Sequence, residues 1–174
     1  GLGTGAALAA GNGSISITGN STAGAGTGNS KGVTLGYATV TTGTGDITLA
    51  GTGGAGVTGN VGVDLAGNTT VVTSTDGGDI SIDGTSTGSA AGNTNVGVRL
   101  NNSARVEATG AGTLNVDGTG GSGSANKWRR RGLMEARSGV TENVVGSARQ
   151  RRVFVEFGIA TLGLFKPQLF VLLV

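Results

Sequence analysis

Residues 43–74 read GTGDITLAGTGGAGVTGNVGVDLAGNTTVVTS, and this stretch decides the fold of the chain. It holds three short patches in which aliphatic residues alternate with small or polar ones, namely Ile47 with Leu49, Val63 with Leu65, and Val71 or Val72. Spacing of period 2 over a few residues is typical of β-strands. About a dozen Gly, Thr, Ala and Asn residues separate the first two patches, which predicts a long surface loop.

The same pattern recurs on both sides of this stretch. Residues 11–42 and 75–108 align with it, and a further copy begins at residue 109, so the period is 32 to 34 residues. A fixed period of this size indicates a repeat architecture. The first patch forms a column of like residues (Ile15, Ile47, Ile80 and Leu114). Such columns favour a β-solenoid, because like aliphatics stack from coil to coil at about 4.8 Å.

We therefore expect an all-β chain, with residues 11–126 forming a parallel β-helix of coils about 32 residues long. Another all-β fold, such as a propeller, and an unfolded low-complexity chain are the alternatives. The residues predicted to point inward are the paired aliphatics of the first two patches: Ile15, Ile17, Val33, Leu35, Ile47, Leu49, Val63, Leu65, Ile80, Ile82, Val98, Leu100, Leu114 and Val116.

The composition divides the chain at residue 126. Residues 1–126 contain 32 of the 37 glycines, with three basic and seven acidic residues. Residues 127–174 contain nine basic and three acidic residues and five of the six aromatic ones. We expect a Gly/Thr/Asn-rich solenoid over 1–126 and an irregular, basic then apolar tail over 127–174.

The tail allows two interpretations. Its apolar end, residues 153–174, is interrupted by Glu156, Lys166 and Pro167, so it lacks the roughly 20 apolar residues that span a bilayer. A genuine tail would act through its arginine clusters, on membranes or nucleic acid. Alternatively the tail is out of frame. With CGN arginine codons, a forward shift of one base allows residues 127–132 to encode Asn-Gly-Gly-Val, which restores the G-V-x-L step of the repeat.

The repeats resemble those of large bacterial adhesins of the filamentous-haemagglutinin and autotransporter-passenger type. The residues that carry this resemblance are 43–56, 77–90, 110–123 and the G-V-x-L steps at 32–35, 62–65 and 97–100. The resemblance covers residues 1–126. It implies a right-handed parallel β-helix that is exported and displayed at the cell surface, with no catalytic motif in this region.

The composition excludes several chemistries. The chain has neither Cys nor His, so it has no thiolate or imidazole metal site and no Ser-His-Asp machinery. Asp83 and Asp117 share one repeat position and are weak Ca²⁺ candidates. A solvated turn position is the favoured interpretation, because Thr18 and Ala50 are their equivalents. The same holds for the pair Asp46 and Asp79. We expect no catalytic residue, no cofactor and no metal site.

The expected function is structural. The chain is predicted to be a fragment of a large secreted or surface-displayed bacterial protein, located outside the cell, that contacts glycans or proteins of host or neighbouring cells. Contact would be made by the loops at 51–62 and 84–97 rather than by a pocket, and we expect no nucleic-acid partner and no membrane span. The alternatives are a carbohydrate-active β-helix enzyme, or membrane or nucleic-acid association through the tail.

Overall fold

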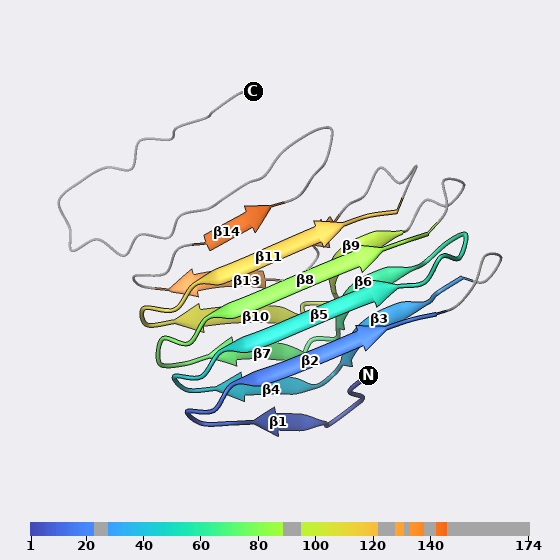
Figure 1. Cartoon of the computed structure of the whole chain (residues 1–174). Helices are drawn as coiled ribbons and strands as arrows, with labels where there is room; N and C mark the ends of the chain where they lie inside the picture. The colour runs from blue at the N-terminus through green and yellow to red at the C-terminus, as the bar shows by residue number, and fades with distance from the viewer. Residues whose placement is uncertain (23–27, 89–94, 122–127, 131–132, 138–141, 146–174) are drawn as a thin grey trace.

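The chain forms a right-handed parallel β-helix of about three turns (Figure 1). The computed structural model describes residues 1–22, 28–88, 95–121, 128–130, 133–137 and 142–145. These residues contain strands and no helix. None of them therefore forms a helix that could cross a membrane. The all-β solenoid predicted from the repeat is confirmed.

Each coil contributes one strand to each of three parallel sheets. The first sheet contains β2 (Ile15–Asn20), β5 (Ile47–Gly53), β8 (Ile80–Ser86), β11 (Leu114–Thr119) and β14 (Glu142–Val145). The second contains β3 (Lys31–Gly36), β6 (Val61–Ala66), β9 (Val96–Asn101) and β12 (Trp128–Arg130). The third contains β1 (Ala7–Ala9), β4 (Thr39–Thr42), β7 (Val71–Ser74), β10 (Arg105–Thr109) and β13 (Leu133–Arg137).

Like residues stack in register, and the stacked aliphatics fill the space between the sheets. Ile47 pairs with Ile15 on one side and with Ile80 on the other. Thirteen of the fourteen residues predicted to point inward are buried. The exception is Ile17, which is only half-buried because it lies at the open N-terminal end. In the third patch the inward residue is Val72, and Val71 is half-buried.

The loop between the first two patches is shorter and less exposed than predicted. Strand β5 continues to Gly53 and β6 starts at Val61, which leaves residues 54–60 as the loop. Only Ala55, Val57 and Thr58 are exposed there. In the next coil, residues 89–94 of the predicted contact loop 84–97 lie outside the described part of the chain.

Three short strands lie beyond residue 126. Strands β12, β13 and β14 pair in parallel with β9, β10 and β11, so each of the three sheets has one strand from this region. The last of these strands ends at Val145. The apolar stretch 153–174 lies outside the described residues.

Glycines allow the first and second sheets to come together. A Cβ atom on Gly51 would lie 2.1 Å from the carbonyl oxygen of Gly62, and one on Gly84 would lie 2.2 Å from that of Gly97. Real Cβ atoms do not approach backbone oxygens so closely. The glycines that precede V-x-L are as tightly placed, because a Cβ on Gly62 would lie 2.3 Å from the nitrogen of Thr85, and one on Gly97 would lie 2.3 Å from that of Thr119. We call this line of contacts the glycine seam.

Candidate functional site

The two weak calcium candidates lie next to each other on the outer face of the first sheet. Asp83 pairs in register with Asp117, and the coil before them has Ala50 at this position. Asp83 is exposed and Asp117 is half-buried. Ca²⁺ takes six to eight oxygen ligands. Among the described residues, no group of three or more acidic side chains gathers to hold a metal ion.

Asp46 and Asp79 link successive coils. The Oδ1 atom of Asp46 accepts a 2.8 Å hydrogen bond from the backbone N–H of Asp79, and Oδ1 of Asp79 accepts one of 2.6 Å from the N–H of Thr113. One coil earlier, the hydroxyl of Ser14 accepts the N–H of Asp46. This column therefore satisfies backbone donors at the start of each first-sheet strand.

An ion cluster around a buried carboxylate lies on the second sheet. The carboxylate of Asp64 is 1% exposed and lies 2.6 Å from Nζ of Lys31. On the opposite side, Nε of Arg99 donates a 2.8 Å hydrogen bond to Oδ1 of Asp64, and Nη2 donates one of 2.8 Å to Oδ2. Each member belongs to a different strand, β3, β6 or β9. The cluster therefore joins three coils.

The charges of this cluster stabilise one another. Burial on its own raises the pKa of Asp64, but the hydrogen bonds and positive charges of Arg99 and Lys31 outweigh it and hold that pKa below its ordinary value. The hydrogen bond to Asp64 raises the pKa of Arg99. A retaining or inverting glycosidase uses a pair of carboxylates with room for substrate between them. Here a single carboxylate is enclosed by two cations, which is the arrangement of a structural ion cluster.

A second buried polar group links the loops. Asn60 and Asn95 are both fully buried, and Nδ2 of Asn60 donates a 2.8 Å hydrogen bond to Oδ1 of Asn95. Nδ2 of Asn60 also donates to the carbonyl of Gly56, and the N–H of Ser30 donates to its Oδ1. The two asparagines thus connect the backbone of one loop to the next coil through hydrogen bonds. We call them the asparagine ladder.

Sequence reasoning missed both groups, although each leaves a signal. The middle position of the G-V-x-L step holds Thr34, Asp64 and Arg99 in successive coils, which places opposite charges in one column. The step N-V-G-V occurs at 60–63 and again at 95–98. A polar residue repeated before a buried strand is a sign of a paired position inside the fold.

The outer face of the first sheet carries rows of small side chains, all of them polar except Ala50. Three rows run across the coils, at the outward positions of each strand. The rows are Ser16, Thr48, Ser81 and Asn115; then Thr18, Ala50, Asp83 and Asp117; then Asn20, Thr52, Thr85 and Thr119. Every one of these side chains is exposed or half-buried. We call this surface the hydroxyl face.

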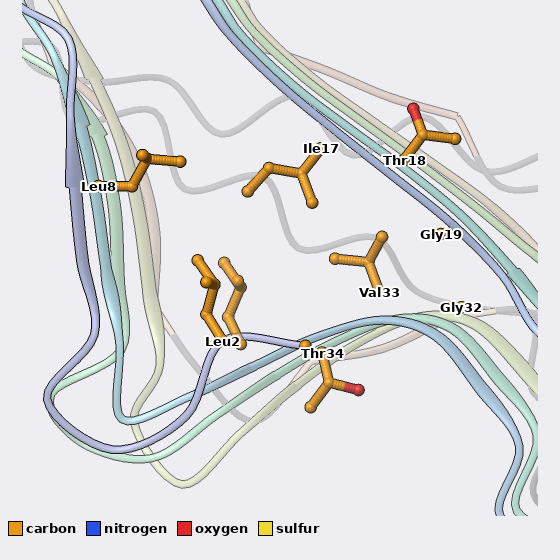
Figure 2. Close-up of a pocket in the computed structure, with 10 residues that line it drawn as sticks. Leu2, Leu8, Ile17, Thr18, Gly19, Gly32, Val33 and Thr34 are labelled. Carbon is orange, nitrogen blue, oxygen red and sulfur yellow. The ribbon is translucent and has the colours of Figure 1, made fainter.

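An apolar hollow of about 230 Å³ opens at the N-terminal end. Leu2, Leu8, Ile17 and Val33 project into it, as Figure 2 shows. No acidic or basic side chain lines it. The hollow therefore offers mainly aliphatic contacts.

Comparison with known proteins identifies no relative. No family model, no curated protein and no solved structure gives a significant match to this chain. The fold and its surfaces therefore carry the functional argument.

Proposed function

We propose that the chain is a structural and adhesive repeat segment of a large secreted or surface-displayed bacterial protein, with no catalytic role. The observation that carries this proposal is the hydroxyl face, a regular surface whose polar rows repeat from coil to coil in register. Strands lie about 4.8 Å apart in a sheet, so these rows present hydrogen-bonding groups at a constant spacing. Such a surface suits glycans or proteins of a neighbouring cell.

The interior of the solenoid favours a role as a rigid stalk rather than as a binding pocket. The coils are joined by the stacked aliphatic core, the ion cluster and the asparagine ladder. Each coil contacts only its neighbours, so the surface grows with the number of coils. Many weak contacts then add up along the face, as in other multivalent binders.

The test measures adhesion of beads coated with the full chain to cells and to a glycan array. The variant Thr48→Glu with Ser81→Glu places two glutamates on neighbouring strands of the hydroxyl face. The matched control is Thr41→Glu with Thr73→Glu, which places the same pair on neighbouring strands of the third sheet. We expect beads coated with the unchanged chain to adhere. The variant Thr48→Glu with Ser81→Glu should lose this adhesion, and the control Thr41→Glu with Thr73→Glu should retain it. Binding no stronger than that of uncoated beads, or equal loss in both variants, would overturn the proposal.

A further inference from the structure

Tyr37 occupies a turn position that glycine and asparagine hold in the two coils that follow. The turn between the second and third sheets begins directly after the register partners Gly36, Ala66 and Asn101. The equivalent positions that come next are Tyr37, Gly67 and Asn102. All three have a positive φ, of 56°, 106° and 51° respectively. The left-handed conformation is therefore a property of this turn.

Tyrosine is an unfavourable residue for such a position. The left-handed region is open to glycine, which has no Cβ atom, and asparagine tolerates it because of its short polar side chain. A bulky residue in this region is strained, and strained residues cluster at binding and active sites. Since Gly67 and Asn102 satisfy the same turn in the next coils, the turn itself does not require the ring of Tyr37.

The turn holds this ring on a fixed backbone. The N–H of Tyr37 donates to the carbonyl of Ala66 at 3.0 Å and to the hydroxyl of Thr70 at 2.8 Å. On the other side, its carbonyl accepts a hydrogen bond of 3.1 Å from the N–H of Gly5. Neighbouring turns thus lie on both sides of Tyr37 along the stack. A further coil at either end of the solenoid would stack beyond them and would not cover the ring.

The ring is exposed and lies against a glycine. Tyr37 is 46% exposed. A Cβ atom on Gly67 would lie 2.7 Å from Cδ1 of Tyr37, so the ring packs on the backbone of the next turn. A rigid aromatic side chain held in this way offers a large contact area and loses little conformational entropy when a ligand binds.

The surroundings of the ring are polar and neutral. Asn68 and Thr69 are exposed in the turn that contains Gly67, and Asn102 and Ser103 are exposed in the turn after it. Their amide and hydroxyl groups both donate and accept hydrogen bonds. No residue of the neighbouring turns is charged, that is, of residues 3–6, 36–38, 66–70 and 101–104.

We propose that Tyr37, with Asn68 and Asn102 beside it, forms a binding site for one neutral sugar residue of a glycan. The C–H groups on one face of a pyranose ring would lie on the negative face of the aromatic ring. The hydroxyl groups of the sugar would pair with the two amides. An anionic ligand would find no positive charge here, and an acyl chain would leave the amides without partners.

This site is separate from the hydroxyl face. It lies on the turns between the second and third sheets, whereas the hydroxyl face belongs to the first sheet. The inference therefore stands independently of the adhesive role proposed for that face.

The experiment follows the full chain by fluorine NMR after incorporation of fluorotyrosine. Tyr37 is the single tyrosine of the chain, so the spectrum reports on this ring alone. The probes are the methyl glycosides of glucose, galactose and N-acetylglucosamine. Sorbitol is the matched control, because it carries hydroxyl groups without a pyranose ring. We expect a saturable shift with at least one glycoside, with a Kd of about 1–10 mM, and none with sorbitol.

Variants separate the ring from the turn, with binding followed by saturation transfer to the glycoside signals. Tyr37→Phe keeps an aromatic ring and should bind. Tyr37→Asn removes the ring but suits the left-handed turn, so it should lose binding and melt no lower than the unchanged chain. Asn68→Ala should weaken binding at least about threefold. The control Thr48→Glu with Ser81→Glu changes only the hydroxyl face and should bind the sugar as the unchanged chain does.

Three outcomes would overturn the inference. The first is no saturable shift with any of the three glycosides at about 50 mM. The second is an equal shift with sorbitol. Both use the unchanged chain, so they need no variant to interpret. The third is sugar binding that Tyr37→Asn retains, because the ring would then not be part of the site.

Discussion

Arg99 binds the carboxylate of Asp64, which lies in the neighbouring coil, through two hydrogen bonds of 2.8 Å each, donated by Nε and Nη2. Bidentate pairing of this kind fixes both the distance and the orientation of the two side chains. Lys31 approaches the same carboxylate from the other neighbouring coil. The cluster therefore fixes the lateral register of three successive coils on the second sheet.

The first prediction concerns the pH dependence of stability. The pKa of Asp64 is lower in the folded chain than its ordinary value. A lowered carboxyl pKa stabilises the fold above the unfolded pKa of about 3.9, and this stabilisation is lost as the pH falls through the folded pKa. We therefore expect the melting temperature to drop as the pH falls below about 4.

The variant Asp64→Asn isolates this contribution. It should lower the free energy of unfolding at neutral pH by about 1–3 kcal/mol, because two partly buried cations lose their partner. It should also flatten the acid limb of the stability curve. The control Asp83→Asn removes an exposed carboxylate beside Ala50 and should leave that limb in place. An unchanged acid limb in Asp64→Asn would contradict the assignment.

The second prediction concerns the asparagine ladder. Asn60→Ala removes the acceptor of the Ser30 N–H and the donors to Gly56 and Asn95, and all of these groups lie inside the fold. Buried polar groups without partners cost about 1–3 kcal/mol each. We expect the variant to lose about 2–4 kcal/mol of stability in urea titrations.

The exposed Asn68 supplies the control for this experiment. Asn68→Ala should change stability by no more than about 0.5 kcal/mol. If Asn60→Ala unfolds no earlier than Asn68→Ala, the ladder has no stabilising role.

Most of the fold could be predicted because its signal is local and repeated. Alternation over three to five residues identifies the strands, and the period aligns them into columns such as Ile15, Ile47 and Ile80. The error at Ile17 is an end effect. The same pattern that buries Leu49 leaves Ile17 half-buried, because no described first-sheet strand covers it.

The polar contacts are missed when whole repeats are aligned on the first patch, because loop length varies between coils. Val33 and Val63 are 30 residues apart, whereas Val63 and Val98 are 35 apart. An alignment anchored on the first patch therefore does not bring Asp64 next to Arg99. The pairing emerges only when the G-V-x-L steps themselves are superimposed, as the structure does through β6 and β9.

The third prediction concerns calcium. Asp83 and Asp117 supply two carboxylates, whereas Ca²⁺ prefers six to eight oxygens. We expect the melting temperature in excess EDTA to equal that in millimolar CaCl₂. A rise in CaCl₂ that Asp117→Asn removes would show that the pair binds the ion.

The fourth prediction concerns the reading frame after residue 126. The out-of-frame interpretation predicts that the gene across codons 105–174, resequenced and read one base forward, shows the G-V-x-L and I-x-I steps resuming. A forward frame without these steps would mean that the basic and apolar tail is genuine. Its binding to anionic vesicles would then be the next measurement.

The fifth prediction concerns the glycine seam. A Cβ at position 51 would lie 2.1 Å from the carbonyl oxygen of Gly62, and both atoms belong to paired backbone that has little room to move. We expect Gly51→Ala to cost at least about 2–3 kcal/mol, as overpacking of a dense interior does. Gly62→Ala should behave similarly, because its Cβ would lie 2.3 Å from the nitrogen of Thr85.

Gly36 provides the matched control, since it also lies in a strand of the second sheet. Its Cβ would find its nearest neighbour, the carbonyl oxygen of Leu2, at 3.9 Å. Gly36→Ala should therefore be neutral, or should stabilise by up to about 1 kcal/mol through the unfolded chain. Equal losses for Gly51→Ala and Gly36→Ala in thermal melts would show that close contact between the sheets is not the reason for glycine in the seam.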